Sequence, residues 1–139
     1  MRLSIRNQLP GIVLDVAVGD AMAAVGVRLE GGQVITAAIT RDAATELNLS
    51  EGSSVRALIK STEVSLAAGP VTGLSIRNQF PGRVTDVALG QAVARVRLAV
   101  EGGELTSVIT RDSAAELGLA TGSSVVALVK STEVALATD

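Results

Sequence analysis

The sequence has no cysteine, histidine, tryptophan or tyrosine, and Phe80 is its single aromatic residue. Without cysteine there is neither a disulfide framework nor a thiolate metal site, and without histidine the usual zinc, copper and iron sites lack their preferred ligands. Nucleophile–histidine pairs of the serine or cysteine protease type are excluded as well. A single aromatic side chain argues against a single-strand nucleic-acid binder, which normally uses several stacking platforms.

Long apolar runs and an excess of one charge are also missing. The 139 residues are 47% hydrophobic with a net charge of −2, yet no apolar run approaches the roughly 20 residues that span a bilayer. Arg2 and Arg6 interrupt the segment where a signal peptide needs an apolar core. We expect a cytoplasmic protein that binds neither membrane nor nucleic acid.

The strongest positive feature is an internal repeat. The hexapeptide Leu3–Gln8 returns unchanged as Leu74–Gln79, and Lys60–Val64 returns as Lys130–Val134. The small residues and the proline of segment 68–73 have the composition of a linker. We predict a first module over residues 1–68, a linker over 69–73 and a second module over 74–139. Modules this small with so much apolar surface predict an obligate oligomer.

Within each module the hydrophobic period is mostly that of strands. Leu3 and Ile5 alternate with Ser4 and Arg6, which predicts a strand, and residues 55–60 predict another that is buried on both faces. Residues 40–47 predict a short helix capped by Thr40. The fold class is therefore mainly β: two tandem OB-like Greek-key β-barrel modules, each with one short helix.

Three polar clusters recur in both modules, and they contain hydrogen-bond donors but no carboxylate. They are Ser4 with Arg6, Thr40 at the helix start, and Lys60 with Ser61. Such a set suits a small oxyanion with acceptors on every side. Each cluster also has a purely structural explanation: Ser4 faces solvent, Thr40 only caps the helix, and Lys60 is a surface lysine.

The motifs Ser-Ile-Arg-Asn-Gln-x-Pro-Gly, Ile-Thr-Arg-Asp-(Ala/Ser)-Ala-x-Glu-Leu-x-Leu, Gly-Ser-Ser-Val and Lys-Ser-Thr-Glu-Val occur in this order in both repeats. In order and spacing they resemble the Mop domains of the molbindin family, over essentially the whole chain. The resemblance implies a di-Mop molbindin: a homotrimer of tandem chains that binds molybdate between subunits. The metal is then bound as an oxyanion, with no direct side-chain ligand and no catalytic cofactor.

The resemblance also implies which residues bind the anion. Carried over residue by residue, the oxyanion-binding set is Ser4, Arg6, Thr40, Lys60, Ser61, Ser75, Arg77, Thr110, Ser113, Lys130 and Ser131. The first repeat departs from the pattern, because Ala43 replaces the serine present as Ser113, so a site using Ala43 is expected to lose one hydroxyl donor. A possible second type of site comprises Asn7, Gln8, Asn78 and Gln79, whose amides could equally cap the ends of strands.

The expected function is molybdate or tungstate binding for storage, buffering or delivery. The 139 residues hold neither a helix-turn-helix nor a phosphate-binding Gly-x-x-x-x-Gly-Lys-Ser/Thr loop, so we expect a free-standing binding protein. One alternative is an oligomeric OB-type assembly module in which sulfate is a structural ligand. Another is an enzyme that uses the recurring acids Asp15, Asp86, Glu63 and Glu133, which are more simply explained as solvated or paired; we expect no enzyme.

Overall fold

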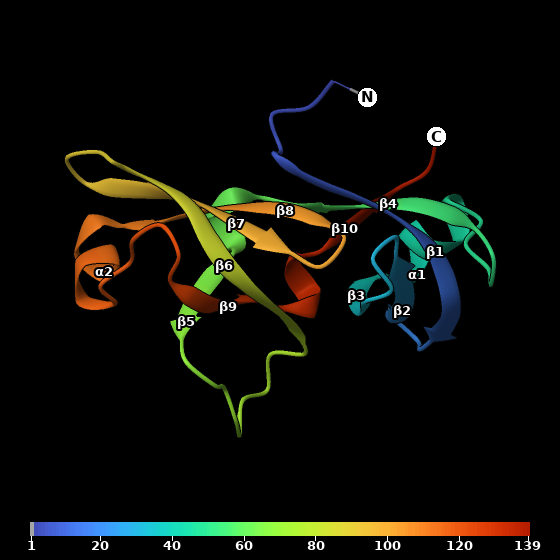
Figure 1. Ribbon diagram of the computed structural model, residues 1–139. Coiled ribbons are helices and arrows are strands. Elements are labelled where there is room, and N and C mark those ends of the chain that lie inside the picture. Colours follow the sequence, from blue (N-terminus) through green and yellow to red (C-terminus); the bar gives the residue numbers. More distant parts are fainter. Residues whose placement is uncertain (1) are drawn as a thin grey trace.

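The computed structural model describes residues 2–139 and contains two five-stranded antiparallel sheets, one for each repeat (Figure 1). The first sheet contains β1 (Asn7–Val18), β2 (Met22–Leu29), β3 (Val34–Thr40), β4 (Ser54–Ile59) and β10 (Ala135–Ala137). The second contains β5 (Ser65–Ala68), β6 (Asn78–Leu89), β7 (Val93–Val100), β8 (Gly103–Thr110) and β9 (Ser124–Val129). The helices are α1 (Arg41–Glu46) and α2 (Arg111–Glu116), with the 3-10 helices η1 (Ser61–Glu63) and η2 (Ser131–Glu133). The predicted fold class is confirmed.

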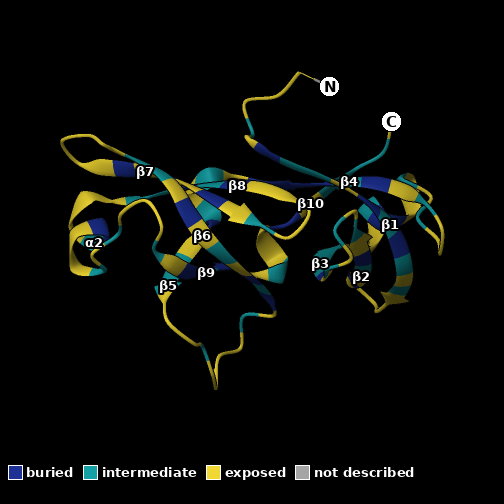
Figure 2. Ribbon diagram, in the orientation of Figure 1, coloured by how far each residue is buried: buried dark blue, intermediate teal, exposed yellow. Residues whose placement is uncertain are grey.

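Each sheet curls around a core of aliphatic side chains, and every second residue points inward. In β2 the side chains of Val25 and Val27 are fully buried while those of Ala24 and Arg28 are exposed, and β7 repeats the pattern (Figure 2). β4 is buried on both faces from Ala57 to Ile59, as its sequence predicts. The curvature that closes each core is helped by a bulge in β1 between Val13 and Asp15, and β6 bulges at the same place.

The predicted short helix forms in both repeats. The hydroxyl of Thr40 accepts a hydrogen bond from the N–H of Ala43 at 3.1 Å, which satisfies one of the free donors at the helix start. The helix ends before Asn48, whose φ is 53°, and Gly118 ends the second helix with a φ of 61°. Both are residues that accept the left-handed conformation needed there, so the predicted helix ends are confirmed.

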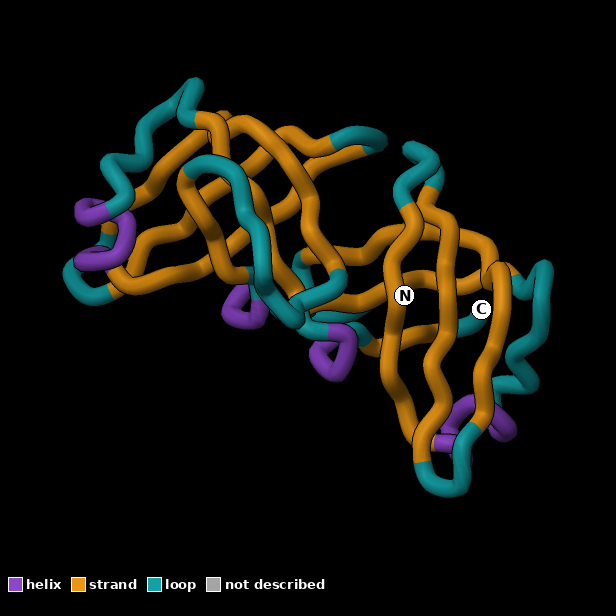
Figure 3. Tube along the Cα trace, turned by 90° about the horizontal axis from the view of Figure 1, so that it is seen from below, coloured by secondary structure: helices purple, strands orange, loops and turns teal. Residues whose placement is uncertain are grey.

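The repeats exchange their last strands. β10, from the end of the second repeat, pairs with β4 of the first, and β5, from the end of the first repeat, pairs with β9 of the second. The valines that precede these strands, Val64 and Val134, are almost fully buried, and they follow η1 and η2. η1 packs against β8 and η2 against β3, and Figure 3 shows both 3-10 helices in the middle of the molecule. Each sheet is therefore complete only with a strand contributed by the other repeat.

Further contacts tie the two sheets together. The side-chain amide of Asn7 donates to the carbonyl of Thr106 and accepts from its N–H, both at 2.8 Å, and Asn78 pairs with Thr36 in the same way. Each buried amide thus satisfies backbone groups of the opposite sheet. No helix within residues 2–139 is long and apolar enough to cross a bilayer.

The expected strand over residues 3–6 does not form. β1 starts at Asn7, which is paired with Ile59, the last residue of β4. Beyond Ile59 the chain turns into η1, so residues 3–6 have no neighbouring strand to pair with. The prediction was wrong because alternation of apolar residues indicates burial on one face and does not supply a partner strand.

Candidate functional site

The lysine turns lie where β4 and β9 give way to the 3-10 helices. Lys60 immediately precedes η1, and its carbonyl accepts from the N–H of Glu63 at 2.9 Å; Lys130 and Glu133 repeat this turn. Both lysines are exposed. The two ion pairs found within residues 2–139, Arg56 with Asp139 and Arg95 with Asp86, involve neither of them. Each ammonium group is thus unpaired and able to bind an anion.

The serine next to each lysine has a buried hydroxyl with no hydrogen-bond partner among the described residues. The Oγ atoms of Ser61 and Ser131 both have this property. A buried polar group left unsatisfied costs about 1–3 kcal/mol, and such groups are rare in folded proteins. Their occurrence at the same position of both repeats favours a partner that arrives on binding, although the turn has to shift before a ligand can reach these enclosed hydroxyls.

Two hollows surround the lysine turns and are related by the repeat. The hollow at Lys60, about 310 Å³, and the hollow at Lys130, about 130 Å³, both include Glu63 and Glu133. The first is also lined by Ile5, Leu58 and Thr132, and the second by their counterparts Ile76, Leu128 and Thr62. Thr62 and Thr132 are not among the residues predicted to bind the anion, although their place in the repeated Lys-Ser-Thr-Glu-Val motif was a signal for them.

The helix starts offer hydroxyl donors of a different kind. In the second repeat the hydroxyl of Thr110 accepts from the N–H of Ser113 and donates to its Oγ at 2.8 Å, which leaves the Ser113 proton free. In the first repeat the hydroxyl of Thr40 only accepts, from the N–H of Ala43, and keeps its own proton free. Each helix start therefore has one free hydroxyl proton, despite the replacement of serine by alanine.

The segments before β1 and β6 are exposed, and their arginines differ. The guanidinium of Arg6 donates to the carbonyls of Leu3 and Ser4, at 2.7 and 3.1 Å. Arg77, its counterpart, makes no such bond among the described residues, and Ser4 and Ser75 are both exposed. Arg77 is therefore free to bind a ligand through all of its donors, whereas Arg6 already uses two of its five N–H groups.

One chain brings only part of the predicted set together. The hollows at the lysines contain no helix-start residue, and a groove of about 320 Å³ beside Ser113, lined also by Ser65 and Leu66, contains neither lysine. Figure 3 shows α1 and α2 at opposite ends of the molecule, away from η1 and η2. Lysine turns and helix starts are thus separate half-sets within the single chain.

The amides proposed as a second type of site are already engaged. Both polar atoms of Asn7 and of Asn78 bind backbone groups of the other repeat. Gln8 donates to the carbonyl of Ile5 and Gln79 to that of Ile76, both at 3.0 Å. These bonds fit the alternative of amides that cap strand ends, and they leave a second site as a prediction.

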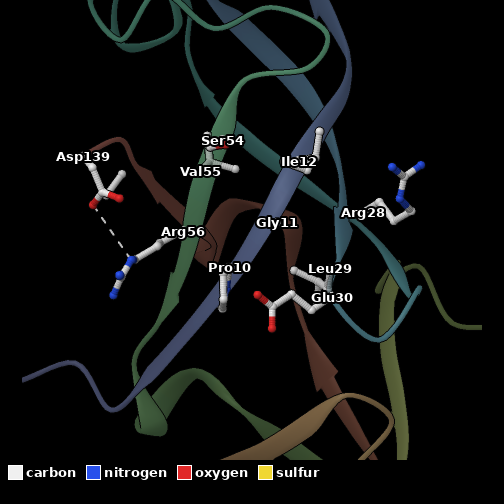
Figure 4. A pocket seen from close by; sticks show the side chains of 11 residues that line it. Pro10, Gly11, Ile12, Arg28, Leu29, Glu30, Ser54, Val55, Arg56 and Asp139 are labelled. Carbon is white, nitrogen blue, oxygen red and sulfur yellow. Dashed lines mark ion pairs between the residues drawn. The ribbon is translucent and has the colours of Figure 1, made fainter.

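A further hollow, of about 350 Å³, lies over β1, β2, β4 and β10 and contains none of the predicted residues (Figure 4). It has two guanidinium groups, but Arg28 and Arg56 point away from each other, and Arg56 lies 4.0 Å from Asp139. Its cations therefore do not converge on one ligand. No group of three acidic side chains suited to hold a metal ion occurs within residues 2–139.

Known proteins resemble this chain over its whole length. Residues 3–66 and 74–136 each match the TOBE domain. The molybdenum-pterin-binding protein MopB of Rhodobacter capsulatus is 44% identical, and the molybdenum transport protein ModE of Azotobacter vinelandii is 41% identical; both matches cover 99% of this chain. The chain spans about half the length of these relatives, 52% and 51%.

A solved structure has the same arrangement. The cytoplasmic molybdate-binding protein ModG, in a form with molybdate bound, is 36% identical, and the two structures superpose with a TM-score of 0.97 over 100% of both chains. The tandem of Mop-type modules predicted from the repeated motifs is confirmed. The chain consists of two Mop-type TOBE domains in tandem and belongs to the TOBE-domain family.

Proposed function

We propose that this protein binds molybdate, or tungstate, as an intact oxyanion held by hydrogen bonds. The observation that carries the proposal is the match over both entire chains to ModG, a protein whose structure was solved with molybdate bound. The unpaired lysines and the partnerless buried hydroxyls of Ser61 and Ser131 support it, because both are donor groups that an anion would satisfy.

The chemistry of the donor set favours a fully deprotonated dianion. Molybdate and tungstate carry no proton at neutral pH and only accept hydrogen bonds. Hydrogen phosphate carries a proton that needs an acceptor, and the predicted oxyanion-binding residues include no carboxylate, although Glu63 and Glu133 line the same hollows. Sulfate has the same charge and shape as molybdate, so its rejection depends on the size of the binding cavity.

We propose that the complete site forms between subunits of a homotrimer. The lysine turns and the helix starts are separate in one chain, so a neighbouring chain has to bring them together. Each helix start is bordered by exposed apolar side chains: Met22 is paired with Thr40 in the sheet, and Val93 with Thr110. Val18 and Leu89 are exposed at the tips of the same hairpins. Contact with another copy would bury these side chains next to the site.

The biological role proposed is storage, buffering or delivery of molybdenum in the cytoplasm, without catalysis. Relatives include molybdenum transport and transcriptional regulator proteins called ModE, but this chain spans about half their length. We expect no nucleic-acid binding by these 139 residues, because the net charge is −2 and Phe80 is 1% exposed.

A bound pterin is the alternative that the name of MopB raises. A pterin ring is usually held by stacking on an aromatic face and by polar groups at its edge. Phe80 lies inside the core of the second sheet and provides no such face. The free oxyanion is the better ligand for this chain.

The deciding experiment is titration of the metal-stripped protein with molybdate, tungstate, sulfate and phosphate by calorimetry, with metal analysis of the protein as purified. Saturable, reversible binding of molybdate and tungstate, with much weaker sulfate and phosphate binding, is the expected result. Sulfate that binds as tightly as molybdate and does not exchange would favour the structural-ligand alternative. Sedimentation that finds a stable folded monomer would contradict the intersubunit site.

A further inference from the structure

The turn that carries Lys60 and Ser61 is held by a buried hydrogen bond from the other repeat. Ser107, in β8, is 0% exposed, and its hydroxyl donates to the carbonyl of Val64 at 2.6 Å. Val64 directly follows η1, and its N–H closes that turn on the carbonyl of Ser61. The hydroxyl of Ser107 therefore fixes the end of the lysine turn to the second sheet.

The equivalent turn of the second repeat lacks this anchor. Position 37, in β3, corresponds to position 107 and is occupied by Ala37, which is also 0% exposed. The backbone bonds of the two turns are the same: Val134 donates to Ser131 at 3.4 Å, as Val64 does to Ser61. Because alanine has no side-chain donor, Val134 receives no hydrogen bond from position 37.

The anchor matters because the last hydrogen bond of the turn is weak. The bond from Glu63 to Lys60 is 2.9 Å long, but the bond from Val64 to Ser61 is 3.4 Å long, beyond the usual range for an N–H···O bond, so it contributes little to holding the end of η1 in place. A short bond in the low-dielectric core is stronger and directional. The turn that has such a bond loses less conformational freedom when its lysine and serine bind a ligand.

We infer that Ser107 is a positioning residue for the oxyanion sites that use Lys60 and Ser61, and that these sites bind the anion more tightly than those using Lys130 and Ser131. This inference rests on the proposed function and deepens it. The difference between the two classes of site is expected to be about fivefold in affinity, the typical net effect of one neutral hydrogen bond. Ser107 itself need not touch the anion.

The test isolates one class of site at a time and uses molybdate as the probe. Lys130→Ala leaves the sites that use Lys60, and Lys60→Ala leaves the sites that use Lys130. Ser107→Ala is added to each background, and affinities and dissociation rates are measured by calorimetry and by stopped-flow competition. Alanine occupies the equivalent core position in the first repeat, so the substitution is expected to fold. Ala37→Ser, in the Lys60→Ala background, is the reciprocal variant.

Ser107→Ala is expected to weaken molybdate binding about fivefold through faster dissociation in the Lys130→Ala background. The loss should be clearly smaller in the Lys60→Ala background, where the anchored turn lines the hollow through Thr62 and Glu63 but does not supply the binding lysine. Ala37→Ser is expected to strengthen the sites that remain there. A general loss of stability would change both backgrounds alike, so equal effects, or none, would overturn the inference. If Ala37→Ser does not fold, Ser107→Ala decides alone. Failure of the unsubstituted protein to bind molybdate would instead overturn the proposed function.

Discussion

The two helix starts differ by one residue, and the structure changes what that difference means. By sequence, Ala43 removes a hydroxyl that Ser113 supplies, which implies a poorer site in the first repeat. In the structure, Thr110 donates to Ser113, whereas Thr40 donates to no described residue, so each helix start keeps one free proton. Ser107 and Ala37, deep in the core, differ in a way that leaves a hydrogen bond on one side only. A difference outside the site is thus expected to separate the repeats more than a difference within it.

The largest effect is expected from the lysines. Lys60→Ala and Lys130→Ala should each weaken molybdate binding about a hundredfold, or roughly 3 kcal/mol, in the sites that the lysine serves, because a desolvated dianion needs compensating charge. Calorimetry measures the loss, and the rise in Tm caused by molybdate should shrink with it. Arg28→Ala, which removes the same charge from a different hollow, is the control. If molybdate raised the Tm of the parent protein and of all three variants equally, the anion would have to bind elsewhere.

The inter-repeat amides come next. Asn7→Ala and Asn78→Ala should each lower the free energy of unfolding by about 2–3 kcal/mol, because each substitution leaves a backbone N–H and a backbone carbonyl of the other sheet without a hydrogen-bond partner. Denaturant unfolding gives the comparison, and the two costs should agree closely. Gln8→Ala, which removes a single local bond, is expected to cost less than about 1 kcal/mol. Loss of anion binding with unchanged stability would instead favour the second type of site.

A smaller loss is expected where the two β-hairpins touch. A Cβ at Gly31 would lie 2.7 Å from the Cα of Gly102, a backbone atom that cannot move aside. Gly31→Ala should therefore cost about 1–3 kcal/mol by forcing the sheets apart. Gly103→Ala is the matched control, since nothing lies within 4 Å of the added carbon. If both variants unfold at the same denaturant concentration, the contact between the hairpins contributes nothing.

The smallest effect is expected at the helix starts themselves. Ala43→Ser and Ser113→Ala should change molybdate affinity by about threefold or less, below roughly 1 kcal/mol, because the number of free hydroxyl protons stays the same. Titration of both variants alongside the parent measures this. A change of tenfold or more would restore the simple donor count that the sequence suggests.

The sequence was sufficient for the elements whose signals are local. Thr40 as a cap, Asn48 and Gly118 as helix ends, and the alternation in β2 all depend on residues within a few positions of one another. The pairing of strands that lie far apart in the sequence was harder to predict. Leu3 and Ile5 alternate as a strand would, but β4 ends at Ile59 and leaves them without a partner.

The exchange of strands was hidden by the repeat itself. β5 and β10 follow the same Lys-Ser-Thr-Glu-Val motif and contain nearly the same residues, so either of them satisfies the hydrophobic pattern of either sheet. Periodicity cannot distinguish two chemically equivalent strands. The same ambiguity hid the anchor, because only the exchange brings Ser107 of one repeat to Val64 of the other.

The exchange also has a consequence for synthesis on the ribosome. The edge of β4 stays open until β10 has emerged, so the first sheet waits for residue 137, about 80 residues after β4 is complete. β5 likewise has no partner until β9 is translated. During that interval the nascent chain exposes two unpaired strand edges that a neighbouring nascent copy can occupy. We expect crowded polysomes to produce intertwined chains in which β10 of one molecule completes β4 of another.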